Sequence, residues 1–384
     1  MNDKEWKKYR LGDIAELRKE QIAPNGKEQI YLGLEHIEQQ ALRLNGFGSS
    51  NDVVSNKFKF YNGDILYGKL RPYFRKVFNP KFEGVCSTDI YVIKNKAGID
   101  ISYLFYLIAT EDFSLIANSG STGTHMPRAD WNQLKVTEWL VPPLKTQTKI
   151  ASILSSLDEK IELNRQTNQT LEAIAQTLFK EMCLPKSDEL PEGWRVGKLG
   201  EIMNSKGGTT PSTSNDEYWN GEFNFVTPKD LSGLRMPVLL STDRLITEKG
   251  LKQISSGLLP VGTLLMSSRA PIGYFAINQI PVAINQGFIA MNGTTVSNLF
   301  LMYWLKLNLS TIINMANGST FLEISKSVIR NIDIVIPNQE ILEKYDELIV
   351  PIFHRIVTNE QQTQTLISIR DSLLPKLMKG EIGV

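Results

Sequence analysis

The chain has 384 residues, more than one ordinary domain holds, so two or more hydrophobic cores are expected. Its 42 basic and 41 acidic residues give a net charge of +1, which argues against a protein that grips DNA unaided, because counterion release favours strongly basic binders. The N-terminus is charged without an apolar stretch behind it, and no apolar run reaches the length of a membrane span, so neither a secretory signal nor a membrane protein is expected.

Residues 1–145 are predicted to form a first globular domain of the α+β class, large enough for its own core. Short β-rich runs cover 64–67, 85–93 and 134–141, and one apolar helix is expected near 101–115. The stretch 57–81 contains seven basic residues against one acidic residue, with aromatic residues interleaved. This combination suits contacts with phosphates and bases.

Two interpretations of this basic stretch remain open. It is either a DNA-contacting surface or a solvated basic face whose rings belong to the core, and the second is expected for Tyr67. We favour DNA contact for Arg71, Tyr73 and Arg75, and we add Lys69 and Lys76 as candidates.

A second candidate in this domain is the polar loop 119–128, which is rich in glycine and hydroxyl side chains. Such residues allow close approach to phosphates or base edges, although an ordinary surface loop is the alternative. The candidates are Ser121, Thr122, His125 and Arg128. No nucleophile or carboxylate is evidently placed as a partner for His125, so no catalytic role is assigned to it.

Residues 146–185 are predicted to form a long helix. Its seam residues alternate in steps of four and three over about five heptads, which is typical of a coiled coil. The seam positions are Ile150, Leu154, Leu157, Ile161, Asn164, Asn168, Leu171, Ala175, Leu178 and Met182. Pro185 ends the helix, because proline lacks the amide hydrogen that a helix needs.

Residues 186–337 are predicted to form a second domain of the same class, with β-rich runs at 263–267, 283–291 and 332–336 and an apolar helix at 297–315. Its candidate DNA-binding residues match those of the first domain in position but carry less charge. They are Ser268, Arg269, Ser319, Thr320 and Lys326.

Residues 338–384 are predicted to contain a second coiled-coil helix, which Pro351 either starts or interrupts, so that it is shorter or kinked; Gly380 closes it. Asn359 falls on its seam as Asn164 does on the first. A polar seam residue can fix register and partner number, or can simply be tolerated at a loosely packed site. We favour the register role and expect the two helices to pair antiparallel within one chain.

The two halves of the chain repeat the same landmarks in the same order. Leu11-Gly12-Asp13-Ile14 recurs as Leu199-Gly200-Glu201-Ile202, Arg71-Pro72 as Arg269-Ala270-Pro271, and Gly120-Ser121-Thr122 as Gly318-Ser319-Thr320. Further matches relate Asn62-Gly63-Asp64 to Val261-Gly262-Thr263 and the segment 164–171 to 359–366. One short match could be chance, but an ordered set spanning the chain indicates duplication.

Catalytic motifs are missing from this sequence. There is no GxxxxGK[ST] phosphate-binding loop and no GxGxxG dinucleotide motif. The three histidines do not cluster, and the two cysteines lie far apart, so no metal site and no disulfide framework are expected. Reduced cysteines fit a cytoplasmic protein.

These motifs resemble the specificity subunits of type I restriction-modification systems. The resemblance rests on a Trp followed by Leu-Gly-[Asp/Glu]-Ile opening each half, the Gly-Ser-Thr loop, and Pro143-x-x-x-Gln147-x-x-Ile150 leading into Leu157-Asp158 and Asn164. It covers nearly the whole chain twice. The second copy departs after Pro337, where Asn338-Gln339-Glu340-Ile341 replaces the usual run and Phe353 stands at the counterpart of Asp158.

The resemblance implies a non-catalytic subunit. Each globular half would be a target-recognition domain that reads one part of a split sequence in double-stranded DNA, and the helices would act as a spacer. They would also dock adenine methyltransferase subunits, typically two, which restriction and translocase subunits join. S-adenosylmethionine, ATP and Mg²⁺ would belong to those partners, and this chain would hold no cofactor.

Three alternatives are weighed against this expectation. A methyltransferase or nuclease fused to its own reader would need a cofactor or metal motif, and none is visible. A free-standing two-domain DNA-binding regulator would bind DNA tightly by itself. A purely structural coiled-coil adaptor leaves the duplicated domains unexplained.

Overall fold

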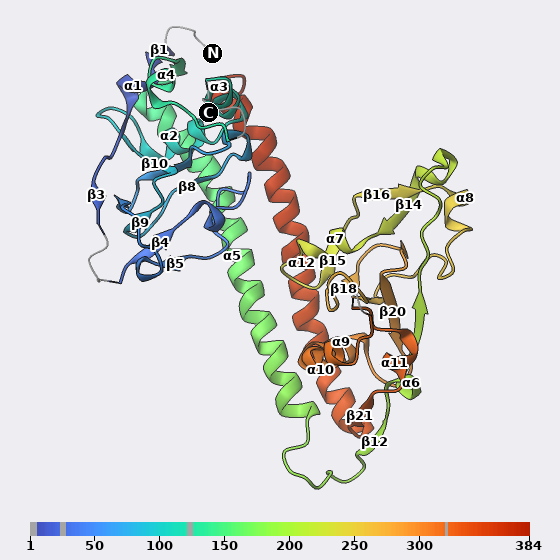
Figure 1. Cartoon of the computed structure of the whole chain (residues 1–384). Helices are drawn as coiled ribbons and strands as arrows, with labels where there is room; N and C mark the ends of the chain where they lie inside the picture. The colour runs from blue at the N-terminus through green and yellow to red at the C-terminus, as the bar shows by residue number, and fades with distance from the viewer. Residues whose placement is uncertain (1–5, 24–27, 121–125, 319–321) are drawn as a thin grey trace. The chain divides into compact units, whose positions relative to one another are not determined.

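The computed structural model describes residues 6–23, 28–120, 126–318 and 322–384 (Figure 1). The chain divides into two compact units, each of which combines one globular segment with parts of the same two long helices. Unit 1 comprises residues 1–161 and 365–384, and unit 2 comprises residues 162–364. Among the described residues, none of the helices combines the length and apolar character that crossing a bilayer requires.

Unit 1 contains a four-stranded sheet in the order β2-β10-β7-β8, a five-stranded sheet β3-β6-β9-β4-β5 and the pair β1-β11. The strands are β1 (Lys7–Arg10), β2 (Ala15–Leu17), β3 (Gln21–Ile22), β4 (Ile30–Leu32), β5 (Gly48–Ser49), β6 (Lys57–Phe60), β7 (Ile65–Gly68), β8 (Val77–Phe78), β9 (Gly84–Cys86), β10 (Ile90–Asn95) and β11 (Glu138–Val141). The helices are α1 (Leu11–Ile14), α2 (Ile101–Ile108), α3 (Glu111–Ser119) and α4 (Trp131–Leu134).

Unit 2 contains a five-stranded sheet β13-β20-β17-β18-β15, a three-stranded sheet β16-β14-β19 and the pair β12-β21. The strands are β12 (Arg195–Lys198), β13 (Met203–Gly207), β14 (Trp219–Val226), β15 (Val238–Leu239), β16 (Arg244–Ile246), β17 (Leu264–Ser267), β18 (Phe275–Asn278), β19 (Val282–Ile284), β20 (Phe288–Gly293) and β21 (Asp333–Ile336). The helices are α6 (Leu199–Ile202), α7 (Pro228–Ser232), α8 (Glu248–Leu251), α9 (Asn298–Leu307), α10 (Leu309–Asn314) and α11 (Lys326–Arg330).

The repeat seen in the sequence is a repeat of structure. The strand order β2-β10-β7-β8 of unit 1 matches β13-β20-β17-β18 of unit 2, and the end pair β1-β11 matches β12-β21. In both units a two-helix segment follows the central strand, α2 and α3 in one and α9 and α10 in the other. The predicted α+β class and the duplication are therefore confirmed.

The expectation of one apolar helix in each domain is wrong, because each segment breaks into two helices. In unit 1, α2 ends at Ile108 and Thr110 caps α3, its hydroxyl accepting a hydrogen bond from the Phe113 amide at 3.2 Å. Asn308 marks the break in unit 2. Threonine and asparagine compete for backbone hydrogen bonds, so they favour helix boundaries even within an apolar sequence.

The two long helices are α5 (Leu144–Cys183) and α12 (Gln339–Met378), each 40 residues long. The prediction that Pro351 shortens the second helix is wrong, because Pro351 lies inside α12. Proline leaves one carbonyl of the preceding turn without its helical partner, and here the packing of α12 compensates for that loss. Residues on both sides of Pro351, Ile349 and Phe353, are buried in the core of unit 2.

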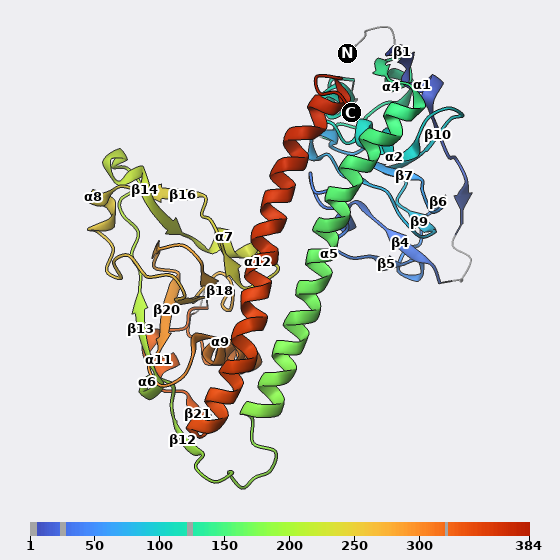
Figure 2. The ribbon, with the colours of Figure 1, turned by 180° about the vertical axis from the view of Figure 1, so that it is seen from behind.

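Each unit builds its core against both long helices. In unit 1, Ile150 and Leu154 of α5 and Leu377 of α12 join the core formed by α2 and the four-stranded sheet. In unit 2, Phe179 of α5 packs against Phe300 of α9 and Tyr345 of α12, with ring centroids 5.4 and 5.9 Å away. Figure 2 shows α9 lying beside α12. The heptad residues of the long helices are therefore shared between the helix pair and the globular cores.

The seam within unit 2 is polar and nearly symmetric. The Asn359 side chain donates to Asn168 Oδ1 at 2.8 Å, and the Asn164 side chain lies 3.4 Å from Thr363 Oγ1. Asn164 corresponds to Asn359 in the repeat, and Asn168 corresponds to Thr363. The two contacts are thus equivalent, as antiparallel pairing of two copies of one helix requires. The expected antiparallel pairing within the chain is confirmed.

The seam within unit 1 is ionic instead. Arg370 of α12 is almost fully buried and donates to Asp158 Oδ1 at 2.8 Å, and Tyr106 of α2 donates to Asp158 Oδ2 at 2.6 Å. Although burial opposes the charge of the guanidinium, Asp158 and Asp371 together hold the pKa of Arg370 above its ordinary value. The repeat counterparts of Asp158 and Arg370 are Phe353 and Ala175, which lie in the apolar core of unit 2.

We expect Asp158→Ala to destabilise unit 1 by about 3 kcal/mol, because it leaves a buried guanidinium without its main partner and Tyr106 without an acceptor. Asp371→Ala is the matched control: Asp371 also pairs with Arg370, but its side chain is exposed, and its loss should cost less than ~1 kcal/mol. Hydrogen exchange of peptides from α2 and α12 measures the two effects. Equal protection losses in both variants would contradict a special role for Asp158.

Candidate nucleic-acid interface

The two candidate stretches of unit 1 meet at one place. After β7 the chain runs through Lys69 and Leu70, and this segment pairs with the end of the polar loop. Leu70 forms an antiparallel bridge with Arg128, and the Ala129 amide donates to the Lys69 carbonyl at 2.9 Å. The Lys69 amide donates in turn to the carbonyl of Asp89, just before β10. Three segments far apart in sequence thus form one small backbone frame.

Unit 2 contains the same frame. Arg269 forms an antiparallel bridge with Glu323, and the Ile324 amide donates to the Ser268 carbonyl at 3.0 Å. The Ser268 amide donates to the Gly287 carbonyl at 2.8 Å. By these hydrogen bonds Leu70 corresponds to Arg269, and Arg128 to Glu323. We call this arrangement the loop frame of each unit.

The residue before the proline that recurs in each frame is strained. Arg71 precedes Pro72 and has a φ of 51°, and Ala270 precedes Pro271 and also has a φ of 51°. A positive φ is unfavourable for residues other than glycine, and such strain persists only where the surroundings enforce it. Its recurrence at equivalent positions shows that the turn is a fixed feature of the fold.

Only part of the basic stretch 57–81, called the basic strip below, is exposed. Arg71 and Tyr73 are exposed, and Arg75, which has a φ of 45°, is half-buried. Tyr73 packs edge-on against Phe74 at 4.6 Å between ring centroids. Residues Pro72–Phe74 form a short 3₁₀ turn, η3, and the arginine on each side of it, Arg71 and Arg75, has a left-handed backbone conformation.

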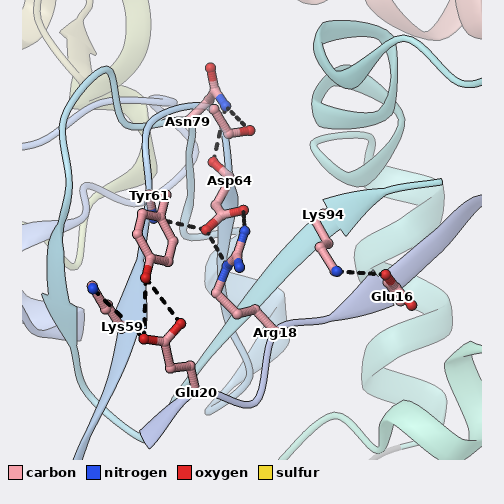
Figure 3. A network of polar contacts seen from close by, with 9 residues as sticks. Glu16, Arg18, Glu20, Lys59, Tyr61, Asp64, Asn79 and Lys94 are labelled. Carbon is pink, nitrogen blue, oxygen red and sulfur yellow. Dashed lines mark hydrogen bonds and ion pairs between the residues drawn. The ribbon is translucent and has the colours of Figure 1, made fainter. Parts of the chain in front are cut away.

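The other end of the strip belongs to a network that stabilises the fold (Figure 3). Asp64 is buried and accepts hydrogen bonds from the Arg18 guanidinium at 2.8 and 3.0 Å. Arg18 and Lys59 each lie 4.6 Å from the ring of Tyr61, whose hydroxyl donates to Glu20. Glu20 comes from outside the strip, so the charge excess counted along the sequence is not a free basic surface.

Two further basic residues point inward. Lys76 was expected to be exposed, and this is wrong: its ammonium group donates to the Leu34 carbonyl at 2.5 Å, and burial lowers its pKa. Lys69 is half-buried, with its ammonium group 5.5 Å from the ring centroid of Tyr91. Tyr67 lies in the core, as predicted.

The predicted DNA-binding residues of unit 2 also include both buried and exposed side chains. Ser268 is buried, so the expectation that its side chain is exposed is wrong, and it serves the loop frame through its backbone. Arg269 is partly exposed, and its guanidinium lies 3.7 Å from Glu323 Oε2. Lys326 is exposed at the first turn of α11. In unit 1 Arg128 is exposed and donates to Asp89 at 3.1 Å.

Several predicted residues lie outside the described part of the chain: Ser121, Thr122, His125, Ser319 and Thr320. Their assignment as DNA contacts stays a prediction. Two acidic residues were not predicted from the sequence: Asp89, which pairs with Arg128, and Glu323, which pairs with Arg269. Glu323 could have been found by placing the repeat over Arg128, but the partnership of Asp89 with a residue 39 positions away could not.

Within the ranges that the structure describes, no group of three or more His, Cys, Asp and Glu side chains could hold a metal ion. Cys86 and Cys183 are free and buried. Burial raises the pKa of the Cys183 thiol to about 12, so this cysteine is held as an uncharged thiol.

Comparison with known proteins decides the family. The model of the type I restriction modification DNA specificity domain matches the chain twice, over residues 3–173 and 191–369. The chain belongs to the type I specificity-subunit family. The two matches, one for each half, also confirm the duplication.

Individual relatives agree with this assignment. The chain is 30% identical to the MjaIX specificity subunit of Methanocaldococcus jannaschii, covering 75% of this chain and 71% of that one. It is 26% identical to the HindI specificity subunit of Haemophilus influenzae, over 98% of this chain and all of the relative. The fold is similar to that of the type I S subunit from M. genitalium, with a TM-score of 0.61 at 17% identity, covering 98% and 97% of the two chains. As a specificity subunit, the chain is the non-catalytic component of its system.

The structure predicts that replacing Lys76 lowers the stability of the fold and that replacing Arg71 does not. Lys76→Ala should lower the free energy of unfolding by about 1–2 kcal/mol, because it removes a partly buried hydrogen bond and the packing of the aliphatic stem. Arg71→Ala, the matched control, should change it by less than ~0.5 kcal/mol, because the Arg71 side chain is exposed. Thermal unfolding of the two variants tests this, and an equal loss in both would make Arg71 a structural residue.

Proposed function

We propose that this protein is the DNA-reading subunit of a cytoplasmic type I restriction-modification complex, in which each unit recognises one part of a split sequence in double-stranded DNA. The observation that carries the proposal is the loop frame. It keeps the same backbone in both units and presents different side chains there, with Leu70 and Arg128 in unit 1 and Arg269 and Glu323 in unit 2. A constant scaffold with variable exposed residues is suited to reading two different sequences.

In unit 1 we assign DNA contact to Arg71, Tyr73, Arg75 and Arg128. Arginine can bind phosphates or the edge of guanine, and a tyrosine side chain has only two rotatable bonds to order on binding. Lys69 supports this surface from its place over Tyr91. For unit 2 the corresponding residues are Arg269, Glu323 and Lys326.

The long helices are proposed to act as the spacer and to dock two adenine methyltransferase subunits. Exposed apolar residues occur at repeat-related positions on both helices: Ile153 corresponds to Leu348, and Ile174 to Ile369. Each unit therefore carries one equivalent pair, which supports two equivalent partner sites. Restriction and translocase subunits would join this complex, and S-adenosylmethionine, ATP and Mg²⁺ would be bound by the partners.

The near-neutral charge supports dependence on partners. With a net charge of +1, the isolated chain has little to gain from counterion release on DNA. A free-standing regulator remains the alternative, and it would have to bind specifically by itself.

Binding to the recognised DNA should therefore be weak for the isolated chain and tight for the complex with its methyltransferase. Arg71→Ala in that complex should weaken binding and lower the slope of log affinity against log salt by about 1 if Arg71 contacts a phosphate. If it contacts a base, discrimination at one position should fall instead. Gel-shift titrations at several salt concentrations measure both effects.

Lys8→Ala is a suitable control, because Lys8 lies on β1, outside the loop frame, and its ion pair with Glu138 is exposed. Tight and specific binding by the isolated chain would favour the regulator. Unchanged affinity and specificity of the Arg71→Ala complex would remove Arg71 from the interface.

A further inference from the structure

The exposed ion pair in the loop frame of unit 2 has the chemistry of a base-pair reader. Arg269 and Glu323 occupy directly opposed positions of an antiparallel bridge, so their side chains emerge on the same face. Both side chains are accessible to solvent, 36% of the arginine and 47% of the glutamate. One residue offers only hydrogen-bond donors and the other only acceptors.

Stability does not account for this pair. Its closest approach is 3.7 Å, longer than a hydrogen bond, and exposed ion pairs of this kind contribute little to folding. The guanidinium therefore keeps donors available for an external acceptor. The glutamate oxygens likewise remain accessible to an external donor.

The edge of a G·C base pair in the major groove matches this arrangement. Guanine presents two acceptors, N7 and O6, and the adjacent cytosine presents a donor, its N4 amino group. Arginine binds guanine through both acceptors, and glutamate accepts from the cytosine amino group. An A·T pair would place a donor against the arginine and the thymine O4 acceptor against the carboxylate, so it would be rejected at both points.

Unit 1 cannot make the same contact. Its frame has Leu70 in place of Arg269, so the guanidinium donor is lost at that position. It has Arg128 in place of Glu323, so a hydrogen-bond donor replaces an acceptor there. Arg128 is instead tied to Asp89 at 3.1 Å, from the turn before β10, where unit 2 has Gly287. The same backbone thus carries side chains with different base preferences in the two units.

We propose that Arg269 and Glu323 together read one G·C base pair in the half of the target that unit 2 recognises, with Arg269 on guanine and Glu323 on cytosine. This inference rests on the proposed function and adds to it a specific base pair and two specificity-determining residues. Neither residue is needed for the fold, so their replacement changes recognition and leaves the stability of unit 2 intact.

The test uses the full chain in complex with the methyltransferase of its system. The recognised sequence is first found by mapping methylated adenines in DNA modified by the wild-type complex. Arg269→Ala and Glu323→Ala are then compared with Lys198→Ala and Asp333→Ala, which remove an exposed ion pair on the strand pair β12-β21, outside the loop frame. Thermal unfolding of each variant verifies that unit 2 remains folded.

We expect both frame variants to relax the same single position, an invariant G·C in the wild type, with a loss of discrimination on the order of 10- to 100-fold. The other half of the target should not change, and both control variants should keep the full wild-type sequence. The inference is overturned if the two variants relax different positions, if neither relaxes any, or if the affected position is not G·C. A wild-type complex that modifies DNA without sequence preference would overturn the proposed function itself, before any variant is compared.

Discussion

The structure depends on the antiparallel pairing of α5 with α12, because neither globular segment completes its core alone. The core of unit 1 needs Leu374 and Leu377 from the last turns of the chain, and the core of unit 2 needs Ala175 and Phe179 from its middle. The apolar residues of each long helix are thus divided between two cores. The seam between the helices also contains buried polar residues: Asn164, Asn168, Asn359 and Arg370. These residues make specific contacts where leucine would pack without selecting a register.

Some contacts along the seam are equivalent in the two halves of the chain, and others differ. Contacts of Asn164 with Thr363 and of Asn359 with Asn168 are equivalent under the repeat. The pair Asp158–Arg370 is not, since its counterparts Phe353 and Ala175 are apolar. An identical pairing of two first-half helices would place Asp158 against alanine, with no cation to compensate a partly buried carboxylate. The asymmetry therefore favours pairing between different halves of the chain over pairing between like halves.

Much of this organisation was predictable from sequence, and the failures have physical causes. Periodicity located both long helices, and ordered landmarks such as Leu11-Gly12 and Leu199-Gly200 revealed the duplication. Local charge counting failed for Lys76 and for the segment around Asp64, because the direction of a lysine side chain and the origin of its partner are set by tertiary packing. Asp89 could not be predicted as the partner of Arg128 for the same reason. The apolar helices broke at Thr110 and Asn308, where capping competed with the apolar pattern.

Membership of the specificity-subunit family explains a chain that combines duplication with the absence of catalytic motifs. The central claim is that its two units read DNA independently. Replacing residues 1–145 with the equivalent domain of another specificity subunit, and mapping the adenines that the resulting methyltransferase complex modifies, tests this most directly. The account predicts that one half of the recognised sequence changes to that of the donor while the other half stays the same. A change in both halves, or in neither, would contradict it.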